Sequence, residues 1–199
     1  MKVLMICTTC PAPPSSGASI RSSGWLRTIA EFAEVGLVTL TRNERERAAL
    51  AELESACATV RSFTAPRTPI RKIRDVVLAA INATPYLVQS GRERRMQAAV
   101  DDILDRWRPD VVQAELLPAA PYLVRPRGFK IPTVYSAHNV ESRIVRGPEN
   151  GLAGRLRAGR MGRVEARIAR RADAVVTVSG HEAKLFRALG AQVCRVPNA

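Results

Sequence analysis

Short apolar segments alternate with amphipathic, helix-like segments along the whole chain, and this alternation limits the fold more than any other feature. Each apolar segment suits one buried strand, and each segment between them is typical of a helix that crosses back over a sheet. We therefore predict a doubly wound α/β fold with a mainly parallel, Rossmann-like sheet and helices on both faces. The alternation reaches the last residue without a repeat, which predicts one domain over residues 1–199.

The expected strands are segments rich in Val, Leu, Ile and Thr. They are Lys2–Ile6, Val35–Thr41, Thr59–Phe63, Asp110–Ala114, Pro132–Ser136, Ala174–Val178 and Gln192–Val196. The expected helices include Glu44–Glu54, the stretch Ile70–Met96 with a break near Thr84 and Pro85, and the basic segment Leu152–Arg171. Ser179, with Glu182 three residues later, predicts a capping box at the start of another helix.

Ligands of doubly wound sheets bind at the carboxyl ends of the strands, where the strand order reverses. The first loop at that edge contains Gly17, ahead of a predicted helix, and Arg21. A glycine there lets backbone N–H groups approach an anion at the positive end of the helix dipole, and Arg21 could contact a phosphate or carboxylate. The loop has neither the dinucleotide-binding glycine pattern nor a Walker A sequence. An ordinary loop with a surface arginine is the alternative.

A second loop at that edge follows the strand that ends at Ser136 and contains His138, Asn139 and Glu141. His138 could hydrogen-bond a sugar hydroxyl or stabilise developing charge. The alternative is a histidine that only caps the loop. The other histidine, His181, lies inside a predicted helix and receives no role.

The chain is strongly basic, with 31 Lys and Arg against 18 Asp and Glu and a net charge of +13. Nucleic acid, an anionic membrane surface and phosphate-bearing substrates all fit such a charge. The basic helix over Leu152–Arg171 could lie on a bilayer or contact phosphates, or its arginines could form the solvated face of a core-packing helix. Nucleic acid is disfavoured because only 5% of residues are aromatic and no recognition motif is present.

The compartment and the cysteines limit the chemistry further. The sequence has no apolar run of 18 residues, and its first residues lack the long apolar region of a signal peptide, so we expect a cytoplasmic protein. Cys7 and Cys10 have the spacing of a redox or metal pair, but a zinc site would need a second pair, and Cys57 and Cys194 lie far apart. We predict no disulfide and no metal.

Taken in order, the motifs resemble the N-terminal domain of family-4 glycosyltransferases with the GT-B fold. The most specific are the run His138-Asn139-Val140-Glu141 and the ending Val196-Pro197-Asn198. The others are Pro13-Pro14 with Gly17 and Arg21, the run Arg108-Pro109-Asp110-Val111-Val112, and Asp173 to Ser179 with Glu182. Together they span essentially the whole chain.

The resemblance implies a role for each site residue. Gly17 and Ala18 would bring backbone close to the donor diphosphate, although many members have two glycines there. Arg21 would lie at the edge of the cleft, and His138 would contact the transferred sugar. Asn139 and Glu141 belong to the same motif as His138. Ser179 would cap the helix that lines the cleft.

The resemblance further implies retaining hexosyl transfer from a nucleotide sugar to a carbohydrate or lipid-linked acceptor, with no metal or other cofactor required. This domain would bind the acceptor, while a C-terminal domain in cis or in trans would hold the donor. After Pro197-Asn198 the family continues into that domain, whereas this sequence stops at Ala199, so we expect little transfer by this chain alone.

Two other functions are alternatives to this glycosyltransferase hypothesis. The first is a non-catalytic binding or partner domain of a split or truncated glycosyltransferase. The second is a basic α/β domain bound to nucleic acid, which predicts steep salt dependence. The positive charge also suits a peripheral location at the inner face of a membrane.

Overall fold

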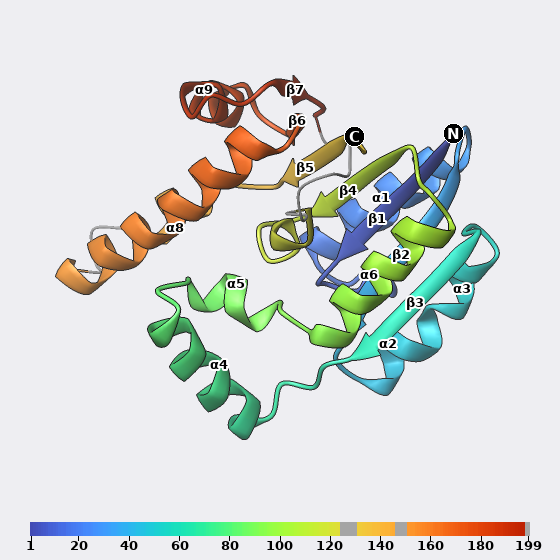
Figure 1. Cartoon of the computed structure of the whole chain (residues 1–199), viewed down its shortest axis with the longest axis horizontal. Coiled ribbons are helices and arrows are strands. Elements are labelled where there is room, and N and C mark those ends of the chain that lie inside the picture. Colours follow the sequence, from blue (N-terminus) through green and yellow to red (C-terminus); the bar gives the residue numbers. More distant parts are fainter. Residues whose placement is uncertain (124–130, 146–150, 198–199) are drawn as a thin grey trace.

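A seven-stranded sheet forms the centre of the molecule in a computed structural model that describes residues 1–123, 131–145 and 151–197 (Figure 1). Its order is β3-β2-β1-β4-β5-β6-β7, and every neighbouring pair is parallel. The strands are β1 (Lys2–Cys7), β2 (Glu34–Thr41), β3 (Thr59–Thr64), β4 (Val111–Glu115), β5 (Thr133–Ala137), β6 (Ala174–Thr177) and β7 (Val193–Arg195). The order reverses between β1 and β4, which confirms the predicted doubly wound sheet.

Both faces of the central strands are buried. In β1, Val3 and Met5 pack under α1 (Gly17–Ala30), whereas Leu4 and Ile6 pack on the opposite face against α6 (Arg94–Arg106). Successive side chains of a strand point to opposite faces, so a strand covered on both sides must be apolar throughout. This explains the unbroken apolar run at the start of the sequence.

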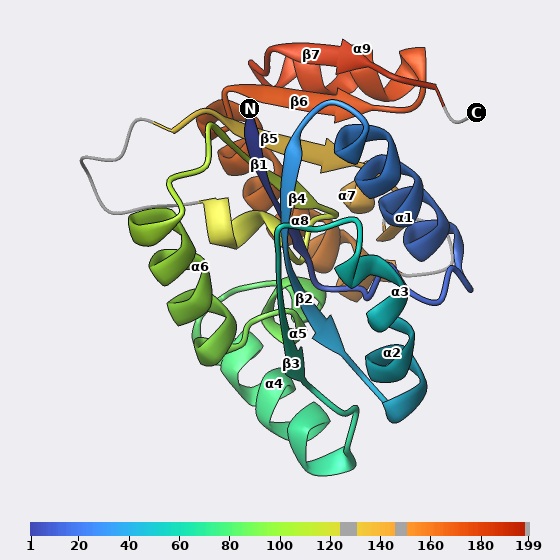
Figure 2. The ribbon, with the colours of Figure 1, turned by 90° about the vertical axis from the view of Figure 1, so that its right-hand side faces the viewer.

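Helices cover the two faces according to the direction in which the chain crosses the sheet. On one face lie α1, α2 (Glu44–Ala49) and α3 (Ala51–Glu54), which connect β1, β2 and β3. On the other face lie α6, α8 (Gly151–Arg171) and α9 (Gly180–Ala188), and Figure 2 shows α6 and α1 on opposite sides of the strands. Right-handed crossovers in opposite directions require this arrangement.

Most of the expected boundaries are confirmed within two residues, and the differences have local causes. Helix α1 begins inside the expected loop because Ser16 caps it. The Ser16 Oγ accepts from the Ser19 N–H at 3.2 Å, and the Ser16 N–H donates to the Ser19 Oγ at 2.8 Å. The expected stretch Ile70–Met96 divides into α4 (Pro69–Ile81), α5 (Tyr86–Ser90) and α6. Its first break is at Pro85 as predicted, and a second, unexpected break follows Gly91.

The basic helix is present as α8, and it packs on the core. Met161, Ile168 and Ala169 are buried against the sheet, while the arginines are exposed. The exposed arginines are Arg155, Arg157, Arg160, Arg163, Arg167, Arg170 and Arg171. This supports the interpretation of α8 as a core-packing helix with a solvated outer face. In the described ranges, no helix is both long and apolar enough to cross a membrane.

Candidate functional site

The carboxyl ends of three strands place polar residues side by side where the strand order reverses. In the sheet register, Glu115 of β4 pairs with Cys7 of β1 on one side and with Ser136 of β5 on the other. His138 follows directly after β5. The chain leaves β1 and β4 toward opposite sides, which is the arrangement that opens a ligand crevice in such sheets.

His138 is held by a buried carboxylate. Its Nε2 lies 3.1 Å from Glu115 Oε2, and the side chains of His138 and Glu115 are 10% and 1% exposed. The other oxygen, Glu115 Oε1, accepts a hydrogen bond of 2.6 Å from Gln113 Nε2. The contact with Glu115 occupies the Nε2 nitrogen of His138. The ring is thus fixed in orientation, and Nδ1 becomes the nitrogen that could meet a ligand.

Arg21 brings a positive charge to the same edge. It lies in the second turn of α1, and it is half-buried. Burial lowers the pKa of Arg21, while the negative charges of Glu115 and Glu182 act in the opposite direction. Because Glu115 ends β4 and Glu182 begins α9, these electrostatic interactions place three elements around one guanidinium. Arg21 thus lies near the carboxyl ends of the strands, close to Glu115 and Glu182.

Gly17 and Ala18 form the first turn of α1, where backbone N–H groups have no partner in the preceding turn of the helix. A Cβ at Gly17 would meet no described atom within 4 Å, so the fold itself does not demand glycine. Gly17, Ile20 and Arg21 line a depression of about 510 Å³ together with Val196 and Pro197. The first and the last of the sequence motifs therefore lie side by side here, although Asn198 of the last motif lies outside the described residues.

Ser179 caps α9 as predicted. Its Oγ accepts from the Glu182 N–H at 3.1 Å, and the Glu182 carboxylate accepts from the Ser179 N–H at 3.2 Å. The two contacts make a reciprocal capping box. Glu182 is also one of the two carboxylates that act on Arg21, so the cap holds a charged group at the edge of the site.

Asn139 and Glu141 lie close to His138 in the sequence but differ from each other in solvent exposure. Asn139 is exposed, whereas Glu141 begins the short helix α7 (Glu141–Val145) and is partly buried. Burial raises the pKa of Glu141 and Glu165 raises it further, while a hydrogen bond with Asn139 and the charge of His138 lower it. The motif thus forms one connected group, with Asn139 at its outer end.

Two carboxylates of this region are absent from the sequence-based set of site residues. Glu115 was missed because the expected strand ended one residue earlier, at Ala114. Glu165 was missed because it lies among the arginines of α8 and resembled part of a solvated face, yet it is fully buried and accepts from the Ser142 N–H at 3.2 Å. The signal for Glu115 was a polar residue directly after a buried strand. The signal for Glu165 was its spacing, because Met161 lies four residues before it and Ile168 three residues after it, which places all three on the same face of the helix.

The cysteines are free thiols in the structure, and two of them are buried. Burial raises the pKa of the Cys7 thiol well above its ordinary value and raises that of Cys10 to about 11. Thiolate, not thiol, is the form that binds metals and attacks disulfides. The pair therefore fits the interpretation of small residues at a strand end. Among the residues with described positions, no three His, Cys, Asp or Glu side chains gather in a way that could hold a metal ion.

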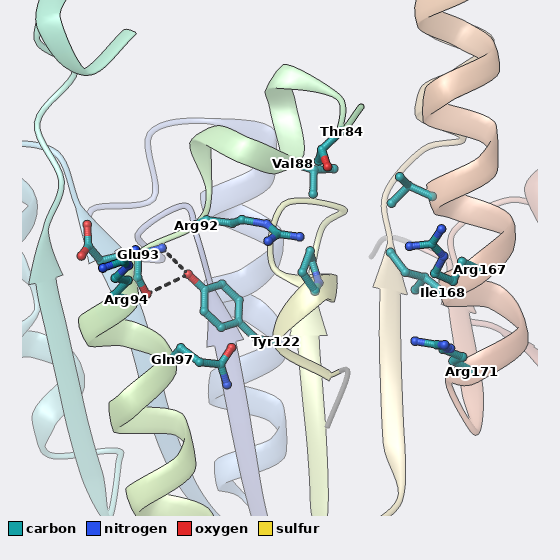
Figure 3. Close-up of a pocket in the computed structure, with 12 residues that line it drawn as sticks. Thr84, Val88, Arg92, Glu93, Arg94, Gln97, Tyr122, Arg167, Ile168 and Arg171 are labelled. Carbon is teal, nitrogen blue, oxygen red and sulfur yellow. Dashed lines mark hydrogen bonds between the residues drawn. The ribbon is translucent and has the colours of Figure 1, made fainter. Parts of the chain in front are cut away.

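A separate pocket of about 380 Å³ lies between α8 and the segment that joins α5 to α6 (Figure 3). Arg92 points across it toward α8, and Arg167 points back from α8. Tyr122, in the 3-10 turn Ala120–Leu123, donates to the Gly91 carbonyl at 2.8 Å and fixes the start of α6. Arg94 and Arg171 add two more positive charges to the lining. None of the sequence-predicted site residues lines this pocket.

Solved glycosyltransferases share this fold. A sucrose-phosphate synthase structure from Thermosynechococcus elongatus matches with a TM-score of 0.53 and 13% identity over 100% of this chain and 90% of that chain. UGT2 of Phytolacca americana, complexed with UDP-2fluoro-glucose and pterostilbene, matches with a TM-score of 0.60 and 9% identity over 100% of this chain and 54% of that chain. UGT89C1 of Arabidopsis thaliana, complexed with UDP-L-rhamnose, matches with a TM-score of 0.53 and 13% identity over 98% of this chain and 51% of that chain.

These likenesses establish the fold, a Rossmann-like half of a GT-B architecture, and this chain spans about half the length of the two plant proteins. A search of curated protein sequences found no match. The sequence itself matches the model of the glycosyl transferase 4-like domain over residues 11–199. That match covers nearly all of the chain and every site residue described above, so the protein belongs to the glycosyl transferase 4-like domain family.

Proposed function

We propose that this domain binds an acceptor and contributes His138 to retaining transfer of a hexosyl group from a nucleotide sugar to an acceptor hydroxyl. The observation that carries the proposal is the His138–Glu115 contact at the point where the strand order reverses. A histidine held in a fixed orientation by a buried carboxylate can hydrogen-bond a sugar without first having to be ordered.

The bonds that form and break in this reaction are those of the donor and the acceptor, so little covalent chemistry is required of the protein. The acceptor oxygen forms a new bond to the anomeric carbon, the bond from that carbon to the diphosphate oxygen breaks, and the acceptor proton leaves with the diphosphate. Negative charge therefore develops on the diphosphate. The first-turn N–H groups of Gly17 and Ala18, the dipole of α1 and the guanidinium of Arg21 are the groups at this edge that would stabilise it.

That arrangement leads us to propose that no metal or other cofactor is required. A helix N-terminus together with a guanidinium supplies the positive character that a bound cation supplies in other phosphate sites. Asn139, Glu141 and Ser179 would then shape the cleft around the acceptor and the sugar, with Ser179 acting through its cap on α9.

The partners follow from the same reasoning. The donor would be a nucleotide sugar held largely by a second, C-terminal domain, joined in cis or acting in trans. The acceptor would be a carbohydrate or a lipid-linked molecule, and its anionic groups would suit the arginines of the pocket in Figure 3. We propose that the protein works in the cytoplasm, partly at the inner face of the membrane.

The test compares two histidine variants in the enzyme with its nucleotide-sugar domain present. His138→Ala should lower the rate of sugar transfer by about a hundredfold or more while circular dichroism shows an unchanged fold. His181→Ala is the matched control, because His181 is exposed in α9 and takes no part in the site. Full activity of the His138→Ala variant would contradict a catalytic role and would leave a binding domain.

A further inference from the structure

Helix α4 turns its apolar face outward, away from the body of the domain. Five large apolar side chains on this helix of 13 residues are exposed, with Ile70 at 81% and Ile81 at 73%. Residues 70, 73, 77 and 81 recur at intervals of three and four, so they form one continuous stripe. The full set is Ile70, Ile73, Val76, Val77 and Ile81.

The inward face of α4 carries charge instead. Asp75 is 2% exposed, with its carboxylate 2.8 Å from Arg74 Nη2 and 3.7 Å from Arg71 Nε. Arg71 also binds Glu93, at the start of α6, at 3.1 Å. Helices of water-soluble domains bury the apolar stripe and expose the charged one. Because α4 exposes its apolar stripe instead, its outer face is suited to an apolar environment.

Cations flank the apolar stripe. Arg74 is exposed on α4 beside the stripe, and Arg67 is exposed just before the helix begins, whereas Lys72, also exposed, lies on the side of the helix away from the stripe. The only acidic residue between positions 67 and 81 is Asp75, which is buried against its arginine partners. An apolar stripe bordered by cations complements the surface of an anionic bilayer, where acyl chains lie beneath negative headgroups.

The place of α4 in the fold suits such a contact. It follows the carboxyl end of β3 and lies beside α5 at the rim of the molecule, off the sheet (Figure 1). The strands are parallel, so this is the edge that also carries His138 and the start of α1. A helix of 13 residues is about 20 Å long and too short to span a bilayer, but it can lie in the interface.

We propose that α4 docks this domain on an anionic lipid bilayer, with its apolar stripe among the upper acyl chains and its cations at the headgroups. Helix α8 is the weaker candidate despite its seven arginines, because its buried apolar residues face the core and Leu156 is its one large apolar side chain that is exposed among those described. Docking through α4 deepens the proposed function, since it would hold the acceptor cleft beside a lipid-linked acceptor. It does not depend on sugar transfer.

Sedimentation with vesicles tests this directly. The chain should bind vesicles of phosphatidylcholine with about 30 mol % phosphatidylglycerol, bind pure phosphatidylcholine poorly, and dissociate as salt is raised. The double variant Ile73→Ser/Val77→Ser should weaken binding by at least about tenfold, since it removes the centre of the stripe. Leu156→Ser on α8 is the matched control and should bind like the parent.

A charge variant separates the two parts of the surface. Arg67→Gln leaves the Asp75 contacts intact and should weaken binding to the anionic vesicles with little effect on pure phosphatidylcholine. All variants change exposed side chains, so thermal unfolding should match the parent. Absence of vesicle binding would overturn the proposal, as would equal loss with Leu156→Ser. A dimer in sedimentation velocity that Ile73→Ser/Val77→Ser dissolves would assign the stripe to a second copy.

If vesicle binding fails while His138→Ala still abolishes transfer, only the docking proposal falls. If vesicle binding succeeds and His138→Ala is fully active, only the catalytic proposal falls.

Discussion

Two buried carboxylates organise the loops around His138. Glu115 fixes the imidazole and Glu165 accepts a hydrogen bond from the Ser142 backbone, next to the motif that contains Glu141. Both act on the buried Tyr135, whose pKa is raised first by burial and then by nearby carboxylates. Buried carboxylates are costly unless they are paired or hydrogen-bonded. Their presence here indicates that the position of this loop matters more than maximal stability.

The titration of Glu165 gives a prediction for stability. Burial raises the pKa of Glu165 in the folded state, so above the pKa of the unfolded chain the folded state binds more protons. This contribution is fully present below the unfolded pKa and is lost as pH rises through the raised folded pKa. Between pH 5 and pH 7, the parent should therefore lose more free energy of unfolding than Glu165→Gln, as measured by urea denaturation at both values.

The control for this titration is Glu52→Gln, because Glu52 is exposed on α3 and should leave the pH dependence unchanged. An identical pH dependence for Glu165→Gln and the parent would show that Glu165 does not titrate in this window.

The sequence allowed some of these residues to be predicted but not others. His138 and Arg21 follow a strand end and a glycine loop, and such positions can be located from the pattern of apolar residues alone. Glu115 pairs with His138 across 23 positions of sequence, and that pairing depends on the parallel register of β4 and β5. Glu165 depends on which side of α8 faces the sheet. Neither is a local property of the chain.

Elements were predicted best where their own period defined them. The strands and α8 have clear apolar periodicity, and Ser179 with Glu182 located the start of α9. Helix α7 has only five residues and depends on its packing against α8, so no period could indicate it. The stripe of α4 was visible as helical spacing, but spacing is the same whether the stripe faces the core or the outside. Only the fold determines that choice.

A pair of glycines provides a test of packing at this scale. A Cβ at Gly36 of β2 would lie 2.9 Å from the ring of Trp107, which follows α6, whereas a Cβ at Gly159 of α8 would meet nothing within 4 Å. Gly36→Ala should lower the free energy of unfolding by about 1–3 kcal/mol, because a packed ring must move. Gly159→Ala should raise it by about 0.5–1 kcal/mol, since alanine loses less entropy in a helix.

Guanidinium denaturation of both variants measures the difference. Equal effects of the two substitutions would mean that α6 does not press on β2 through Trp107.

Over the whole molecule, the features of the proposed function gather at one edge. His138, the start of α1 and the depression beside Val196 and Pro197 lie at the carboxyl ends of the strands, and α4 flanks the same edge. In a GT-B architecture such an edge faces a second domain across the cleft. A domain with this geometry would receive an acceptor from a membrane on one side and a donor from its partner domain on the other.

This division of labour predicts that the purified 199-residue chain transfers sugar at little or no rate. In the proposed function, the described residues at this edge supply one histidine, one half-buried arginine and one helix N-terminus, and a second domain would hold most of the donor. Transfer should therefore appear only when a nucleotide-sugar domain is present, and assays of labelled donor with and without that domain measure it.

The intact mass of the protein from its source distinguishes a second domain joined in cis from one that acts in trans. A mass near twice 21.7 kDa means that the second domain is joined in cis, and a mass near 21.7 kDa together with activity restored by a separate domain means that it acts in trans. Appreciable turnover by the chain alone would show that the groups around His138 hold the donor unaided, and the proposed partition between two domains would then be wrong.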